Sequence, residues 1–213
     1  MDYLERIDWL KKRLGQPLPG RAGQERMAAR VKPMPDVIPS DARPSAVMSL
    51  LFPVENELHL LFIKRTEDGH AHSGQVSFPG GKQDPVDTNL KATALREAQE
   101  EVGIMPADVD ILGELTPLYI PVSNFQVHPF VAFAKERPTY NINEAEVRHI
   151  LEVPVSELFH ADRKVTTGVI SPAMPGVKMT VKAYQLVDGT IIWGATAMIL
   201  SELETILEEL GNP

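Results

Sequence analysis

The chain has 213 residues, which suits one domain of moderate size, and its 43% hydrophobic content is enough for a sizeable core. Its net charge of −8 argues against a partner such as DNA or RNA, because binding to a nucleic acid polymer depends on clustered lysine and arginine. The absence of cysteine excludes disulfides, thiolate catalysis and zinc–thiolate sites. The longest apolar run, residues 46–53, is too short to span a bilayer, so we expect a cytoplasmic protein without a membrane partner.

The first 44 residues are expected to pack on a core formed by residues 45–213. Residues 2–14 place leucine and isoleucine on one side of a helix, and Gly15 and the prolines after it end that helix. Six prolines then punctuate residues 16–44. This composition predicts an extended lead-in, with a short helix over residues 24–31, that wraps the core or contributes to a homodimer contact.

Apolar runs rich in Leu, Val, Ile and Phe predict a series of strands after this lead-in. They cover residues 46–52, 58–64, 75–78, 110–118 and 127–134. An Asp-Gly pair at 188–189 predicts a hairpin that adds an edge to the same sheet. The two arms of this hairpin are residues 177–186 and 190–193.

The last segment, residues 195–210, has the period of an amphipathic helix. Its glutamates are expected to form a solvated face. They are Glu202, Glu204, Glu208 and Glu209. With the strands before it, this helix places the chain in the α/β (α+β) class, with helices around a mixed β-sheet.

The stretch GGKQDPVDTNLKATALREAQEEVGI, residues 80–104, combines a turn with a helix. Gly80 and Gly81 lack a Cβ, so the backbone can approach a ligand or a neighbouring helix closely. Thr88 or Asn89 can cap a helix that starts near residue 90, and Gly103 is well placed to end it.

Three carboxylates crowd one edge of this helix. Glu97 and Glu101 lie one turn apart beside the apolar stripe, with Glu100 next to them. Like charges at this spacing destabilise a helix, and Arg96 offsets part of the repulsion because it can reach Glu100. Hard carboxylate oxygens at this spacing suit Mg²⁺ or Mn²⁺. The alternative is a solvated acidic face, which the glycine turn upstream makes the weaker interpretation.

These residues resemble the Nudix box, a glycine and a mid-box acid followed by Arg-Glu-apolar-x-Glu-Glu-x-Gly-apolar. The matching residues are Gly81, Asp87, Arg96, Glu97, Ala98, Glu100, Glu101, Gly103 and Ile104. The loop between Gly81 and Arg96 is one residue longer than usual, and its acid is Asp instead of Glu. The resemblance implies a Nudix-type α/β/α sandwich, a hydrolase activity and a divalent metal held by Glu97, Glu100 and Glu101, with Arg96 orienting Glu100.

A longer loop with Asp is typical of the coenzyme A pyrophosphatase branch of that family. Residues 60–81, which lead into the box and are distinct from the Pro-rich segment at 16–44, resemble the same branch. They contain LLFIKR at 60–65, HSGQ at 72–75 and FPGG at 78–81. Lead-in and box together cover about 45 residues of the chain. The resemblance therefore implies hydrolysis of coenzyme A or acyl-CoA to 3′,5′-ADP and 4′-phosphopantetheine or its acyl form.

Other candidate residues lie outside the box. In the coenzyme A branch the loop at residues 66–73 borders the substrate, which makes Arg65 and His72 candidates for substrate binding with Gly80 and Gly81. His70 and His72 are otherwise solvated loop histidines. Glu146 resembles an acid that many family members place near the metal; the alternative is a glutamate on a helix surface. The general base is left open between Glu100, Glu146 and a metal-bound hydroxide.

Two other functions fit the same pattern. The same machinery could act on ADP-ribose, a dinucleoside polyphosphate or an oxidised nucleotide, because the box reads only the diphosphate and the metal. A regulator that binds a nucleotide without catalysis is the alternative from another class. Regulators on this fold commonly lose box glutamates, whereas this chain keeps Glu97, Glu100 and Glu101.

Overall fold

The computed structural model describes residues 2–28, 37–67, 72–170 and 176–211. Within them, the helices are α1 (Tyr3–Leu14), α2 (Gly20–Glu25), α3 (Leu90–Val102), α4 (Val155–Leu158) and α5 (Ala195–Glu208), with short 3-10 turns η1 (Pro106–Asp108) and η2 (Ala161–Arg163). The strands are β1 (Arg43–Val54), β2 (Glu57–Arg65), β3 (Val76–Ser77), β4 (Gly80–Lys82), β5 (Val109–Glu114), β6 (Leu118–Ile120), β7 (Phe125–Ala134), β8 (Val147–Pro154), β9 (Lys164–Ile170), β10 (Lys178–Gln185) and β11 (Ile191–Trp193). The order of elements is that of a mixed α and β fold.

An eight-stranded mixed sheet forms the centre of the molecule. Its path runs β3-β2-β1-β7-β5, and β4, β6 and β8 pair with β1, β7 and β2. Strand β1 pairs in parallel with β7 and antiparallel with β2 and β4. A strand in the middle of a sheet that is covered on both faces is expected to be apolar throughout, as β1 is from Ala46 to Phe52 apart from Ser49.

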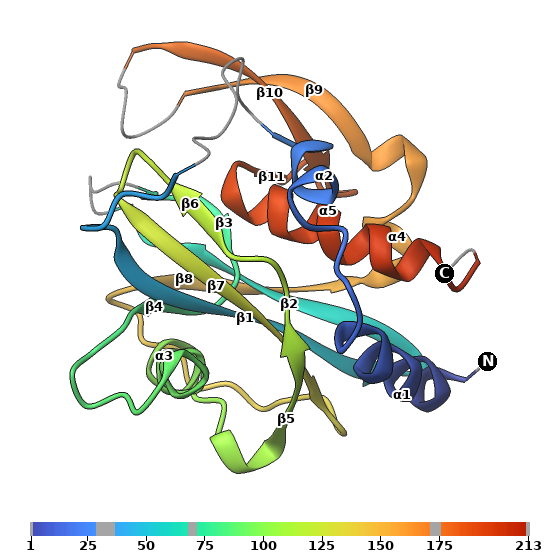
Figure 1. Cartoon of the computed structure of the whole chain (residues 1–213). Coiled ribbons are helices and arrows are strands. Elements are labelled where there is room, and N and C mark those ends of the chain that lie inside the picture. The colour runs from blue at the N-terminus through green and yellow to red at the C-terminus, as the bar shows by residue number, and fades with distance from the viewer. Residues whose placement is uncertain (1, 29–36, 68–71, 171–175, 212–213) are drawn as a thin grey trace.

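Helices cover both faces of this sheet, as the predicted α/β/α sandwich requires (Figure 1). Helix α3 packs on one face, where Ala94, Ala98 and Val102 meet the even-numbered residues of β1. Helices α1 and α5 pack on the other face, where Leu10 and Leu203 are fully buried. We call these the α3 face and the α5 face of the sheet.

The hairpin predicted from Asp188 and Gly189 forms, with β10 and β11 paired antiparallel. The prediction that it extends the main sheet is wrong. Strand β10 pairs instead with β9, which the sequence patterns did not predict, and the three strands form a separate sheet. Tyr184 and Ile192 explain this position, because their side chains are buried in the core on the α5 face.

The prediction of a solvated glutamate face on α5 is wrong for Glu202 and Glu204, which are 0% and 1% exposed. Glu204 accepts a hydrogen bond from the Tyr184 hydroxyl at 2.9 Å and pairs with Lys164 at 2.7 Å. Glu202 is surrounded by neutral donors from α2 and from the loop between β5 and β6. Burial of a carboxylate requires such partners, and they come from segments distant in sequence.

The amino-terminal segment packs against the domain. Helix α1 begins at a capping box between Asp2 and Glu5 and buries Ile7, Leu10 and Leu14. The predicted helix at 24–31 lies earlier, as α2, and residues 29–31 fall outside the described residues. No helix in the described segments is long and apolar enough to cross a membrane.

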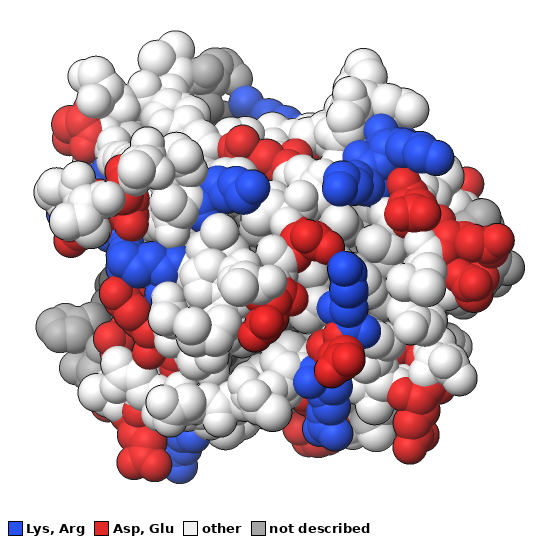
Figure 2. Space-filling model, turned by 90° about the horizontal axis from the view of Figure 1, so that it is seen from below, with Lys and Arg blue, Asp and Glu red and all other residues white. Residues whose placement is uncertain are grey.

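Charges of both signs are interspersed on the surface that carries α3. Figure 2 shows this face, where lysine and arginine alternate with aspartate and glutamate. A surface that holds a phosphate backbone presents a continuous basic stripe. The face shown in Figure 2 presents no such stripe among the residues that the structure describes.

Candidate active site

A cavity of about 420 Å³ opens between the glycine turn, α3 and the start of α5. Its wall includes the predicted residues Arg65, His72, Gly80, Gly81, Glu97, Glu101 and Glu146. Neither Arg96 nor Glu100 belongs to this wall. Residues from the lead-in to the box and from the helix therefore meet at one site. Arg65 and Glu101, for example, are 36 positions apart in the sequence and are in contact there.

Helix α3 carries Glu97 and Glu101, and hydrogen bonds and backbone conformation fix both of its ends. The Asn89 side chain caps it by accepting a hydrogen bond from the Ala92 N–H at 3.0 Å. Gly103 ends it in the left-handed conformation, with φ 78°. Between these caps, Ala94 and Ala98 pack on the sheet, so Glu97 and Glu101 lie beside the glycine turn.

Glu101 is the most buried of the acids, with a side chain 1% exposed. One of its oxygens accepts a hydrogen bond from the Gly80 N–H at 2.8 Å, and the other accepts one from Arg65 at 3.1 Å. Burial nevertheless raises the pKa of Glu101 to about 7, against the lowering effects of Gly80 and Arg65. Burial likewise raises the pKa of Glu97, with smaller contributions from Glu100 and Glu146.

Arg96 holds the loop and the helix together from outside the cavity. It donates two hydrogen bonds to Asp87, both 2.9 Å long, and one to the Lys82 carbonyl at 3.1 Å. It also pairs with Glu100 at 2.8 Å and with Glu97 at 2.9 Å. The mid-box acid is thus the main partner of this arginine, a role that the sequence patterns did not assign.

The pKa of Asp87 should make the loop sensitive to acid. Hydrogen bonds from Arg96, the largest cause, hold the pKa of Asp87 at about 2, below its ordinary 3.8. Between these two pH values the Asp87 carboxylate is protonated in the unfolded chain and still ionised in the folded protein. The free energy of unfolding therefore decreases as the pH falls toward 2. We expect the stability difference between wild type and Asp87→Asn to be complete above about pH 4 and to shrink toward about pH 2. Urea unfolding at a series of pH values measures it; a constant difference would contradict the role of Asp87.

The two glycines are required for different reasons. A Cβ on Gly81 would lie 2.5 Å from the Glu97 carboxyl carbon, the mobile end of a side chain. A Cβ on Gly80 would instead collide with the Ala46 backbone oxygen, at a φ of 152°. The missing Cβ at Gly81 therefore leaves room for the Glu97 carboxylate, and the missing Cβ at Gly80 leaves room for the backbone of β1.

Alanine substitutions should separate these effects. Gly81→Ala is expected to displace the Glu97 carboxylate and lower kcat by about 10²-fold with little change in the unfolding temperature. Gly80→Ala is expected to destabilise the fold by about 1–3 kcal/mol. Activity assays and thermal unfolding of both variants test the assignment, which fails if Gly81→Ala keeps full activity.

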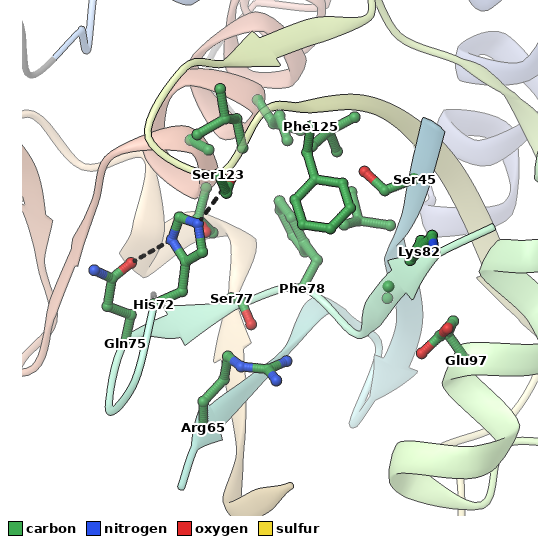
Figure 3. Close-up of a pocket in the computed structure, with 18 of the residues that line it drawn as sticks. Ser45, Arg65, His72, Gln75, Ser77, Phe78, Lys82, Glu97, Ser123 and Phe125 are labelled. Carbon is green, nitrogen blue, oxygen red and sulfur yellow. Dashed lines mark hydrogen bonds between the residues drawn. The ribbon is translucent and has the colours of Figure 1, made fainter. Parts of the chain in front are cut away.

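His72 lies at the far wall of the cavity in the left-handed region, with φ 72°. Its ring contacts Gln75 Oε1 and Ser123 Oγ, both at 3.3 Å, and so links two loops (Figure 3). Burial lowers the pKa of His72, which favours the neutral ring. His70 lies outside the described residues.

Glu146 reaches the cavity rim from a turn before β8, not from a helix surface. Its side chain accepts a hydrogen bond from Asn143 at 3.2 Å, and its carbonyl accepts one from the Thr66 N–H at 3.0 Å. Glu100 is 57% exposed and faces Arg96. Among the described residues, no group of three or more acids or histidines is close enough to form a complete metal cage.

Several cavity residues were not candidates from the sequence. Gln75 and Phe78 lie in the lead-in motif, which gave them a local signal, and Ser123 lies in the loop between β6 and β7. Ser45 and Phe125 carried none, because they meet only through the parallel pairing of β1 with β7. Lys82 follows the two glycines directly, and the sequence patterns gave it no role.

The NUDIX domain model matches residues 42–171, a range that contains the helix, the glycine turn and most of the cavity wall. The chain belongs to the Nudix family. A similar protein from Yersinia enterocolitica, named "Uncharacterized Nudix hydrolase NudL", is 37% identical over 174 residues, 81% of this chain and 85% of the relative. One of the same name from Pectobacterium atrosepticum is 40% identical over 144 residues, 68% of this chain and 72% of the relative.

A solved MutT/nudix family protein from Enterococcus faecalis has the same fold, with a TM-score of 0.52 and 14% identity over 99% of this chain and 80% of that one. This Nudix chain is therefore a hydrolase that acts on pyrophosphate bonds. Nudix hydrolases act on small nucleoside diphosphate derivatives and generally need divalent metal ions. The cavity that contains Glu97 and Glu101 is the candidate site for this chemistry.

Proposed function

We propose that this Nudix hydrolase cleaves the diphosphate of coenzyme A or acyl-CoA, with Mg²⁺ or Mn²⁺ as the metal. One observation carries the proposal. Arg65, His72, Gln75 and Phe78, all from the lead-in typical of the coenzyme A branch, line the same cavity as Glu97 and Glu101. A lead-in that served only folding would not need to face the acids that bind the metal.

The acids fit a magnesium-type ion. Mg²⁺ is usually held by one or two carboxylates, with waters and substrate phosphates completing its octahedron, so a full protein cage is not required. Glu97 and Glu101 supply this pair of hard oxygen ligands in the proposal. Glu100 belongs to the same proposed set, and would have to turn from Arg96 to join it.

Each remaining residue has a proposed task at the diphosphate. Arg65, held by Glu101, would place its positive charge against a phosphate oxygen. Gly80 and Gly81 would allow the diphosphate to approach the backbone closely. Glu146, exposed at the cavity rim, would accept a proton from the attacking water. A bound divalent ion would neutralise charge on the phosphate oxygens and lower the pKa of its bound water.

The proposed reaction consumes one water. Its oxygen forms a bond to one phosphorus while the bond from that phosphorus to the bridging oxygen breaks. The products are 3′,5′-ADP and 4′-phosphopantetheine, or the acyl form from an acyl-CoA, and the proton of the water passes to the base.

A substrate panel tests the proposal. Purified protein with Mg²⁺ or Mn²⁺ would be incubated with coenzyme A, acetyl-CoA, ADP-ribose, NADH and diadenosine polyphosphates, with products resolved by mass and EDTA as the control. We expect the highest kcat/KM for coenzyme A or acetyl-CoA. A higher kcat/KM for ADP-ribose would overturn the coenzyme A assignment and leave the Nudix activity intact.

A further inference from the structure

The cavity continues from the acids on the α3 face to the opposite face of the sheet. In a strand, alternate side chains point to opposite faces. Gly81 pairs with Ala46 and faces α3, whereas Lys82 pairs with Ser45 and faces the α5 side. Lys82, Ser45 and Phe125 all belong to the cavity wall, and we call the part of the cavity that they line, on the α5 side of the sheet, the second chamber.

The second chamber combines a cation with an aromatic ring. Among the described residues, no carboxylate lies within ion-pair distance of the Lys82 ammonium. Phe125 lies in the same chamber, and the Arg43 guanidinium covers one face of its ring at 4.1 Å from the centroid. Arg43 is itself fixed by a hydrogen bond to the Ser123 carbonyl at 2.6 Å.

The strand register sets the distances between these groups. Ser45 pairs with Lys82 on one side and with Val127 on the other, and Phe125 lies two residues before Val127. Neighbouring strands are about 4.8 Å apart. Figure 3 shows Lys82 and Ser45 between Phe125 and Glu97. A nucleotide whose diphosphate lies at the glycines and whose base lies on Phe125 would therefore place its ribose over Ser45, within reach of Lys82.

We infer that Lys82 binds a phosphomonoester on the ribose of the substrate nucleotide, with the base stacked on Phe125. This inference rests on the proposed coenzyme A function, because coenzyme A carries such a group on its 3′ oxygen and ADP-ribose does not. A lysine ammonium is a compact cation suited to a phosphate, and every nucleobase has a π-face for an aromatic ring.

The pantetheine arm is the alternative occupant of the second chamber. An uncharged arm would offer the Lys82 ammonium only neutral acceptors and no opposite charge. The chemistry of the chamber therefore favours the nucleotide end of the substrate, and the two arrangements predict different results when Lys82 is changed.

The test compares coenzyme A with 3′-dephospho-coenzyme A, which differs only in the phosphomonoester. We expect wild type to prefer coenzyme A in kcat/KM by about tenfold, the scale of one charge-assisted hydrogen bond. In Lys82→Met the loss should be concentrated on coenzyme A, mainly through KM, so that the ratio approaches one. Lys82→Arg should restore part of the ratio, and Lys135→Met, an exposed lysine after β7, is the matched control.

Phe125→Leu should lower kcat/KM for both substrates to the same extent, because both carry the base. The inference fails if wild type cleaves the two substrates equally well, or if Lys82→Met lowers both equally, as expected for a lysine that contacts the diphosphate or pantetheine arm. If neither substrate is cleaved, the proposed function fails. Titration with 3′,5′-ADP and 5′-AMP then tests the subsite separately. If Lys82 binds the phosphomonoester, wild type binds 3′,5′-ADP more tightly than 5′-AMP, and Lys82→Met binds the two equally.

Discussion

Glu101→Gln is expected to lower kcat by about 10²–10³-fold, the scale on which one electrostatic contribution to the transition state acts. Glu101 contacts both the glycine turn and Arg65, through hydrogen bonds of 2.8 and 3.1 Å. The glutamine keeps the shape of the side chain but removes the charge that would hold a divalent ion. Steady-state kinetics with varied Mg²⁺ and Mn²⁺ measure the loss, and circular dichroism confirms that the variant is folded.

Two variants on the same helix sharpen this test. Glu97→Gln should lower kcat on the same scale, because Glu97 also lies on the cavity wall. Glu100→Gln should have a smaller effect, because its carboxylate is 57% exposed and faces Arg96. Unchanged turnover in Glu101→Gln would refute the proposed metal role of this residue.

Glu202→Ala is expected to destabilise the protein by about 3 kcal/mol or more, since several buried donors would lose their acceptor. The Glu202 side chain accepts hydrogen bonds from the Gly20 N–H at 3.0 Å, the Thr116 hydroxyl at 2.6 Å and the Gln24 amide at 2.9 Å. It therefore joins α5 to α2 and to the loop after β5. In a domain of this size such a loss lowers the unfolding temperature by roughly 6–12 °C.

The control is Glu208→Ala, at the end of the same helix. Glu208 forms an ion pair with Arg26 at 2.8 Å, and its side chain is 48% exposed. An exposed pair contributes less than about 1 kcal/mol, so this variant should unfold close to the wild-type temperature. Equal unfolding temperatures for the two variants would show that the contacts of Glu202 do not stabilise the fold.

Local sequence determined the elements whose causes are local. The stop at Gly103 and the spacing of Glu97 and Glu101 depend on residues within one helix, so composition and periodicity were sufficient to predict them, and the same patterns limited the cap to Thr88 or Asn89. The same holds for the turn at Gly80 and for the hairpin at Asp188, where short-range backbone conformation decides. The Nudix-type α/β/α sandwich followed from the resemblance carried by those same residues.

Tertiary structure decided what depends on pairing between distant segments. The parallel register of β1 with β7 brings Ser45 and Phe125 to the cavity, and no local pattern encodes a register. Glu202 looked solvated on a helical period, yet donors from α2 and from Thr116 allow it to be buried. A helical period gives the angle of a side chain around its own axis, whereas burial depends on what the rest of the chain packs against that side.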